Sequence, residues 1–266
     1  MCELLGMSAN VPTDICFSFT GLIERGGTRG PHRDGWGIVF YVDGRGRSIH
    51  DPHPGANSEI ANLFKTASIK SHVVISHIRQ ANVGNVSLIN THPYSRHLWG
   101  RTWSFAHNGE LGNLDSLEPR RHRPIGSTDS EFAFCWILDQ ITSAYPDQPP
   151  NSERSGKLLQ ELCDTLRARG IFNMILTDSR RLYAYCSTKM CWLTRRAPFG
   201  KATLKDANMT VNFGEETTGR DIVTIIATTP LTENEEWKCM SKGELCIIED
   251  GEVRSIAPAD AVAKSA

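Results

Sequence analysis

The chain has 266 residues, 39% of them hydrophobic, and can bury a full core as one large domain or two small ones. Its 29 basic and 30 acidic residues give a net charge of -1, so charge offers no reason to expect a nucleic acid or an anionic membrane as partner, and a small or neutral substrate fits better. The N-terminus has no basic stretch followed by an apolar core, and no run approaches the length of a membrane span, which predicts a soluble protein that remains in the cytoplasm.

The eight cysteines are scattered, with no C-x-x-C pair and no paired metal-ligand spacing. Neither a zinc ribbon nor a disulfide framework is indicated, and reduced thiols in a cytosol are the simpler interpretation. His77, His92 and His107 lie in separate segments, without the i, i+4 spacing or the nearby carboxylates that favour a metal site. We therefore expect buried, hydrogen-bonded histidines and no metal ion.

Cys2 precedes the first predicted strand, residues 3 to 7, and has two interpretations. It is a small apolar residue that opens a buried strand, or, once Met1 is removed, a nucleophile whose own α-amine serves as its base. A free thiol has a pKa of about 8.5 and an α-amine one of about 7.7 to 8.0, so the amine can accept the thiol proton. Position alone favours the first interpretation. We expect Met1 to be removed, because the side chain of residue 2 is small.

The first half of the chain predicts helices and strands around one long polar loop. Apolar residues at helical spacing predict a helix over residues 15 to 23, which Asp14 can cap and Gly26-Gly27 ends. We interpret the glycine-rich segment 24 to 37 as a loop that folds over a site, in preference to an RNA contact, because its glycine pair does not repeat. The pattern then predicts a strand over 37 to 42 that turns at Asp43-Gly44, a helix along 60 to 67, and strands over 72 to 76 and 102 to 106.

The second half becomes rich in strands. Thr128 and Glu131 form the S/T-x-x-E pattern of a capping box, which begins a buried helix and places Asp129 in its first turn. After a proline-containing loop, a second amphipathic helix ends at Gly170. Strands follow at 171 to 177, 182 to 187, 191 to 194, 209 to 213, 222 to 228 and 244 to 253. Helices thus bracket two groups of strands, which favours a single two-sheet α+β domain over residues 1 to 266.

Four residues near the ends of predicted elements are suited to acyl transfer at Cys2. Asn108 and Gly109 can offer two N–H donors to one oxyanion, although Asn-Gly is also the commonest dipeptide of hairpin turns. Arg79 can hold a carboxylate by two parallel N–H bonds, or form an ordinary salt bridge. Asp129 can bind a substrate ammonium, or simply cap its helix. Taken singly, each of the four is explained by its structural role.

Five motifs follow one another along the chain: Cys2 behind Met1, H-x-R at 77 to 79, N-x-H-P at 90 to 93, H-N-G at 107 to 109 and T-D-S-E at 128 to 131. In this order they resemble the glutaminase domain of the class II glutamine amidotransferases. Segment 29 to 38 is similar to the R-G-x-D-x-x-G segment of that family's small stand-alone members, and segments 222 to 237 and 243 to 253 are similar to its closing strands. The resemblance therefore covers nearly the whole chain.

The resemblance implies the N-terminal nucleophile hydrolase fold, a four-layer αββα sandwich of two antiparallel sheets flanked by helices. By the same resemblance Cys2 is the nucleophile and its α-amine the base, Asn108 and Gly109 form the oxyanion hole, Arg79 holds the α-carboxylate of glutamine, Asp129 holds its α-ammonium, and His92 is a further substrate-binding residue. Attack on the side-chain amide would release ammonia and leave a γ-glutamyl thioester, which water hydrolyses to glutamate. No cofactor is implied.

Two departures from the family pattern leave the substrate and the acceptor open. Gln80 stands where larger members commonly have Trp or Tyr to help close the site. No synthase domain follows within the 266 residues, so any ammonia acceptor would be a separate protein, such as a synthase acting in trans. Two alternatives remain: an amidohydrolase of another γ-glutamyl compound, as in stand-alone relatives that act on glutathione or ergothioneine precursors, and a non-enzymatic sensing or assembly subunit, against which the intact site residues argue.

Overall fold

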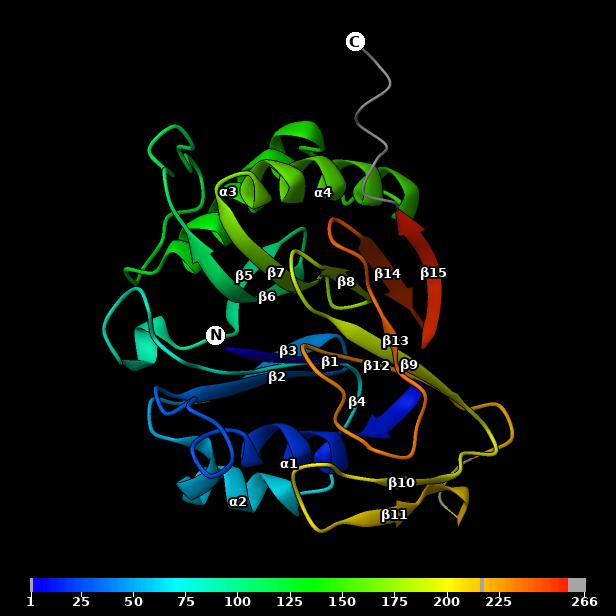
Figure 1. The fold of residues 1–266 in the computed structure, drawn as a ribbon. Coiled ribbons are helices and arrows are strands. Elements are labelled where there is room, and N and C mark those ends of the chain that lie inside the picture. The colour runs from blue at the N-terminus through cyan, green and yellow to red at the C-terminus, as the bar shows by residue number, and fades with distance from the viewer. Residues whose placement is uncertain (1, 216–217, 258–266) are drawn as a thin grey trace.

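Two large antiparallel sheets dominate the computed structural model, which describes residues 2–215 and 218–257 (Figure 1). Met1, whose removal we expect, lies outside the described residues. The first sheet has the strand order β13-β9-β12-β1-β4-β2-β3, and the second has the order β15-β14-β8-β7-β6-β5. The strands of the first sheet are β1 (Glu3–Asp14), β2 (Trp36–Val42), β3 (Arg45–Asp51), β4 (Lys70–Ile78), β9 (Cys191–Arg196), β12 (Ile222–Ala227) and β13 (Lys238–Cys239). Those of the second are β5 (Tyr94–Leu98), β6 (Arg101–Leu111), β7 (Gly170–Thr177), β8 (Arg181–Tyr185), β14 (Leu245–Glu249) and β15 (Glu252–Ala257).

Helices cover the outer face of each sheet (Figure 1). The helices α1 (Cys16–Glu24) and α2 (Glu59–Lys65) lie against the first sheet, whereas α3 (Asp129–Ala144) and α4 (Ser152–Arg167) lie against the second. A small hairpin of β10 (Lys201–Thr203) and β11 (Thr210–Asn212) lies beside α1. The layers are therefore helix, sheet, sheet and helix, and the predicted αββα sandwich is confirmed.

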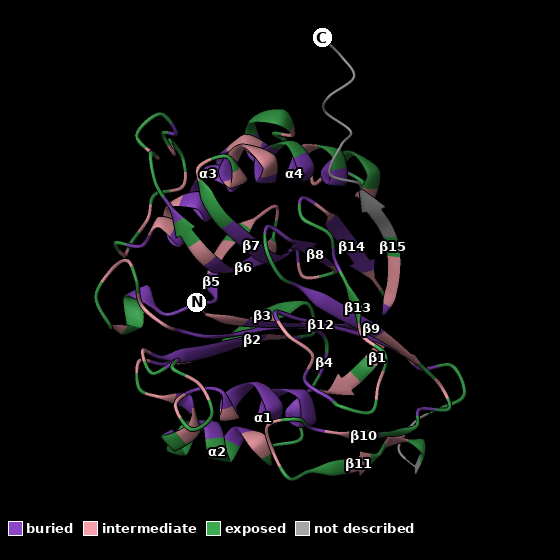
Figure 2. Ribbon diagram, viewed as in Figure 1, coloured by how far each residue is buried: buried purple, intermediate pink, exposed green. Residues whose placement is uncertain are grey.

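The side chains of β1 alternate between two apolar layers. Leu5 and Met7 are buried between the first sheet and its helices, whereas Leu4 is buried between the two sheets. Figure 2 shows the buried residues running through both sheets and the inward faces of the helices. Because β1 pairs with β12 on one side and with β4 on the other, the segment that follows Cys2 is held in the middle of the first sheet.

The helix starts follow the predicted capping residues. Asp14 Oδ1 accepts a hydrogen bond from the backbone N–H two residues later, at 2.6 Å, and Thr128 Oγ1 accepts one from Glu131, at 3.1 Å. Glu131 directs its own carboxylate elsewhere, because it accepts the N–H of Gly126 at 2.6 Å and pairs with Arg96 at 2.5 Å. The capping at Thr128 is therefore confirmed, while the return bond from Glu131 is replaced by contacts with two other segments.

The largest differences from the predicted elements lie at the sheet edges. β3 and β5 were not predicted, since their sequences RGRSIHD and YSRHL are too polar to show an apolar alternation, as is common for edge strands. The predicted turn at Asp43-Gly44 does connect β2 to β3, with φ values of 50° and 73°. Asn108 and Gly109 lie inside β6 and not in a turn, because β7 pairs with them along its length.

Candidate active site

The thiol of Cys2 lies at the start of β1, against the end of β4. Its Sγ is 3.3 Å from the backbone N of Gln80, which donates to it, and 3.4 Å from the carbonyl O of the same residue, to which the thiol donates. Strand pairing produces this contact, because Glu3 is opposite Ile78 in the β1–β4 register. The half-buried thiol therefore lies beside the residue that directly follows Arg79.

Burial raises the pKa of the Cys2 thiol above its ordinary value. The N–H of Gln80 and the positive charge of Arg79 act in the opposite direction but are smaller effects. The thiol consequently keeps its proton at neutral pH and needs a base before it can act as a nucleophile.

The side chain of Asn108 is connected to β1 through Thr228. The Oγ1 of Thr228 accepts hydrogen bonds from the backbone N–H of Leu4, at 2.9 Å, and from Nδ2 of Asn108, at 3.5 Å. The other end of the amide, Asn108 Oδ1, is buried without a hydrogen-bond partner among the described residues. The 3.5 Å bond is long, so the Asn108 amide is positioned near the start of β1 without being strongly engaged there.

Gly109 follows in β6, and its position admits no side chain. A Cβ there would overlap the carbonyl oxygen of Ile171 on β7 and would lie 2.8 Å from His107 Nε2. The backbone of β7 is the obstacle, so relief would require separating two paired strands.

Asn173, opposite Asn108 in the β6–β7 register, holds this part of the sheet in place. Its Nδ2 donates to the carbonyl of Asn108, at 3.0 Å, and to the hydroxyl of Thr188, at 2.9 Å. Its Oδ1 accepts the backbone N–H groups of Ser187 and Thr188, both at 2.9 Å. The fully buried Asn173 thus fixes the backbone of Asn108 and was not singled out from the sequence.

Arg79 is 2% exposed and donates to backbone carbonyls of the loop that follows it. Its Nη1 donates to Asn85 at 3.1 Å, and its Nη2 donates to Val83 and Gly84, both at 3.0 Å. No carboxylate lies within salt-bridge distance of this guanidinium in residues 2–215 and 218–257. A buried cation without an acidic partner is well suited to an anionic group of a ligand.

The loop at 24 to 37 contacts the Arg79 segment, as expected for a loop that folds over a site. Its Asp34 Oδ2 accepts the N–H of Ala81 at 2.7 Å, and the carbonyl of Gly35 accepts the N–H of Arg79 at 2.7 Å. At the other end of the loop, Arg25 pairs with Glu3 at 3.0 Å and so reaches the residue next to Cys2. The loop therefore joins β1 and the end of β4 around the thiol.

Asp129 lies in the first turn of α3, as predicted, and also contacts the end of β6. Its Oδ2 accepts the backbone N–H of Leu111 at 2.7 Å, and its Oδ1 accepts that of Ser130 at 2.9 Å. The hydroxyl of Ser130 lies 2.8 Å from Nδ1 of His107. These bonds place the carboxylate of Asp129 beside the strand that carries Asn108 and Gly109.

The three histidines of the motifs form a buried, uncharged cluster. Burial lowers the pKa of His77 to about 3, with the charge of Arg79 the next cause, and burial also lowers the pKa values of His92 and His107. The ring of His92 is 4% exposed and packs between those of His77 and Tyr94, at 4.2 Å and 4.5 Å between centroids. Neither nitrogen of His92 has a hydrogen-bond partner among the described residues, so the expectation that these histidines are hydrogen-bonded is wrong for this one.

The described residues show neither a metal-binding cluster nor a membrane-spanning helix. Among residues 2–215 and 218–257, no three His, Cys, Asp or Glu side chains are grouped to hold a metal ion. In the same residues, no helix has the length and apolar character needed to cross a bilayer.

Strand pairing thus places Cys2 beside the end of β4 and Arg79, and the packing of the two sheets brings Asn108 and Gly109 of β6 to the start of β1. Asp129 contacts the end of β6, the strand that carries Asn108 and Gly109, and the ring of His92 packs on that of His77 in β4. The residues that link the group were not found from the sequence: Thr228, Asn173, Arg25 and the backbone of Gln80. Thr228 is the last residue of a predicted strand, and Arg25 lies at the start of the predicted loop. These positions are the signals in the sequence that could have indicated a role for them.

Comparison with known proteins shows which family the chain belongs to. The family model for class II glutamine amidotransferases matches residues 1–266. The Escherichia coli protein named "Putative glutamine amidotransferase YafJ" is 57% identical over 245 residues, which cover 92% of this chain and 96% of YafJ. A crystal structure of a "predicted glutamine amidotransferase" from Pseudomonas aeruginosa has 48% identity and a TM-score of 0.77, and covers 96% of this chain and 100% of the other.

The chain therefore belongs to the class II glutamine amidotransferases. A more distant structure supports the fold alone. The glutamine phosphoribosylpyrophosphate amidotransferase of B. subtilis has 14% identity and a TM-score of 0.62, and the match covers 98% of this chain and 50% of the longer one.

Proposed function

We propose that the mature chain begins at Cys2 and hydrolyses the side-chain amide of glutamine through a thioester on that residue. The observation that carries this proposal is the position of Cys2 Sγ, 3.3 Å from the N–H of the residue that follows Arg79. The Asn108 amide lies on the neighbouring sheet and reaches β1 through Thr228. A nucleophile, a cation and an amide donor are thus grouped at the start of β1.

The α-amine of Cys2 takes the thiol proton, and the sulfur attacks the amide carbon of glutamine. An Sγ–C bond forms, and the developing oxyanion accepts N–H bonds from the Asn108 side chain and the Gly109 backbone. The C–N bond then breaks, and the leaving nitrogen takes the proton and departs as ammonia. Water cleaves the thioester to glutamate and restores the thiol.

Recognition of the amino-acid end of glutamine rests on Arg79 and Asp129. A guanidinium has five N–H donors, and the loop carbonyls take three of those on Arg79, which leaves two for the α-carboxylate. His77 and His92 are neutral, so they do not compete for that carboxylate. Oδ1 of Asp129 accepts the N–H and the hydroxyl of Ser130, whereas Oδ2 accepts only the N–H of Leu111 and keeps a lone pair for the α-ammonium. A direct contact between His92 and substrate stays a prediction.

Glutamate release by protein with and without Cys2→Ala tests this proposal. Intact-mass measurement first establishes that Met1 has been removed, and glutamine is compared with a panel of γ-glutamyl amides. We expect Cys2→Ala to abolish release, whereas Cys239→Ala, at an exposed cysteine, keeps it. Equal rates for wild type and Cys2→Ala would exclude an enzyme, and activity in protein that retains Met1 would exclude the amine as base. Faster turnover of another γ-glutamyl amide would change the substrate but not the chemistry.

The ammonia is proposed to pass to a separate acceptor protein, such as a synthase acting in trans. Glutamine turnover that rises when such a protein is added would support this step, and turnover that is indifferent to every candidate acceptor would make hydrolysis the complete reaction.

A further inference from the structure

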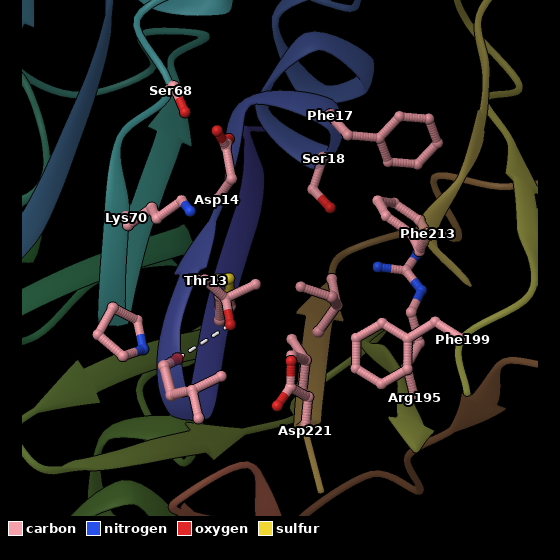
Figure 3. Close-up of a pocket in the computed structure, with 15 residues that line it drawn as sticks. Thr13, Asp14, Phe17, Ser18, Ser68, Lys70, Arg195, Phe199, Phe213 and Asp221 are labelled. Carbon is pink, nitrogen blue, oxygen red and sulfur yellow. Dashed lines mark hydrogen bonds between the residues drawn. The ribbon is translucent and has the colours of Figure 1, made fainter. Parts of the chain in front are cut away.

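A cavity of about 470 Å³ lies on the helix-facing side of the first sheet, between the end of β1, the start of α1 and the segment around Phe213 (Figure 3). Met7, Val223 and Ile225 form its floor, and all three belong to the apolar layer between this sheet and its helices. Leu4, near Cys2, points to the opposite face of β1. The cavity is therefore separate from the candidate active site, and its volume lies within the range of about 300–1,000 Å³ common for ligand pockets.

Three phenylalanine rings form one wall of this cavity. Phe17 and Phe213 meet edge to face, with centroids 5.2 Å apart, and Phe199 lies 6.5 Å from Phe213. The guanidinium of Arg195 lies 4.9 Å from the Phe213 ring and forms two 2.7 Å bonds with Glu235, so its charge is already balanced. A wall of this kind favours an aromatic ring, because a further ring can pack against these faces and edges.

The opposite end of the cavity presents two charges of opposite sign. Asp14 and Lys70 are cross-strand partners in the β1–β4 register, and both line the cavity, with the Lys70 ammonium directed toward Asp14 (Figure 3). Among the described residues, neither forms a salt bridge, with the other or with a third residue. Two neighbouring charges that do not neutralise each other match a ligand with both an anionic and a cationic group.

Between the charged end and the aromatic wall lies the hydroxyl of Ser18. The residue is 5% exposed, and Figure 3 shows its oxygen directed into the cavity. A serine inside a helix often donates to the carbonyl four residues earlier, but Ser18 has no hydrogen-bond partner in the described part of the chain. The hydroxyl faces the cavity and is therefore available for a hydrogen bond with a polar group of a ligand.

We propose that this cavity binds a small zwitterion that carries an aromatic ring, of the class of the aromatic α-amino acids. Its carboxylate lies beside Lys70, its ammonium beside Asp14, and its ring against the wall that contains Phe213. The lining has two basic side chains and two acidic ones, which suits a ligand without net charge. Both oxygens of the second acid, Asp221, accept hydrogen bonds from Thr218, whereas Asp14 uses only Oδ1, for the N–H of Cys16, and keeps Oδ2 for the ligand.

Calorimetric titration of the full chain with L-phenylalanine tests the proposal. Three analogues each lack one recognised group: phenylacetate lacks the ammonium, phenethylamine lacks the carboxylate, and L-alanine lacks the ring. We expect saturable binding of one phenylalanine per chain and at least tenfold weaker binding of every analogue. The absence of saturable binding, or equal binding of the analogues, would overturn the assignment.

Single-residue variants then test whether the ligand binds in this cavity. Ser18→Ala and Lys70→Met should each raise the dissociation constant at least fivefold, whereas Lys157→Met, at an exposed position on α4, should leave it unchanged. Cys2→Ala should bind phenylalanine like the wild type, and saturating glutamine should not displace it. Displacement by glutamine, or loss of binding in Cys2→Ala, would place phenylalanine in the active site and refute a separate one. Because binding is measured without turnover, its failure is distinguishable from a failure of the proposed glutaminase activity.

Discussion

Asn108 and Asn173 are opposite each other in β6 and β7, and replacing each by alanine should separate catalysis from stability. The side chain of Asn108 makes one long hydrogen bond, at 3.5 Å, and its buried Oδ1 has no partner among the described residues. Asn108→Ala removes a weak bond together with an unsatisfied oxygen, so the free energy of unfolding should change by less than about 1 kcal/mol. Turnover should fall by about 10²- to 10³-fold, or about 2.7–4 kcal/mol, the usual effect of losing one oxyanion donor.

Asn173→Ala should instead lower the stability of the protein more than its turnover. Its side chain satisfies two backbone N–H groups, one carbonyl and one hydroxyl, at 2.9 to 3.0 Å, and the residue is fully buried. Leaving a buried polar group unpaired costs about 1–3 kcal/mol, so the loss of this set should lower the free energy of unfolding by about 3 kcal/mol or more. Turnover at a temperature where the variant stays folded should fall less than in Asn108→Ala.

Urea unfolding, followed by tryptophan fluorescence, and glutamate release from glutamine measure the two quantities on the same preparations. The reasoning would be refuted if Asn108→Ala kept more than a fifth of wild-type kcat. It would also be refuted if Asn173→Ala unfolded at the same urea concentration as the wild type, since the buried bonds of its side chain would then contribute nothing.

Three further predictions follow from the site. Arg79→Lys should raise KM for glutamine at least tenfold, because an ammonium has three N–H donors and cannot hold both the loop carbonyls and a carboxylate; an unchanged KM would place the carboxylate elsewhere. Burial lowers the pKa of His77 to about 3, so between pH 6.5 and 3 the unfolded chain binds a proton that the folded chain does not. The free energy of unfolding should therefore be unaffected by His77 above pH 6.5 and should fall on acidification, by about 2 kcal/mol at pH 5. His77→Gln should remove this pH dependence, whereas His97→Gln, at an exposed position, should not. Gly109→Ala should destabilise the protein by about 1–3 kcal/mol or more, as measured by thermal unfolding, because the added Cβ meets the backbone of β7; an unchanged melting temperature would mean that β7 moves freely.

Local signals in the sequence were sufficient for the residues whose role depends on their own element. Asp129 follows a capping threonine and lies in the first turn of α3, and Arg79 directly follows the last residue of β4, both as predicted. Thr228 could not be assigned in this way, since it contacts Asn108 across 120 positions of sequence and only the packing of the two sheets brings them together. The Asn-Gly dipeptide shows the converse, because pairing with β7 along the strand outweighs its local preference for a turn.

The two proposed sites use opposite faces of the same strand, and this arrangement bears on whether they act together. A ligand in the cavity would touch Val223 and Ile225 of β12, and the chain continues from that strand to Thr228, whose Oγ1 accepts a long hydrogen bond from Asn108. Coupling between sites requires an element with two arrangements. β1 and β12 lie inside the first sheet, and each is paired with a strand on both sides, so we expect each to keep a single position. The strands fix the positions of both sites, and we expect occupancy of the cavity to leave the geometry around Cys2 unchanged.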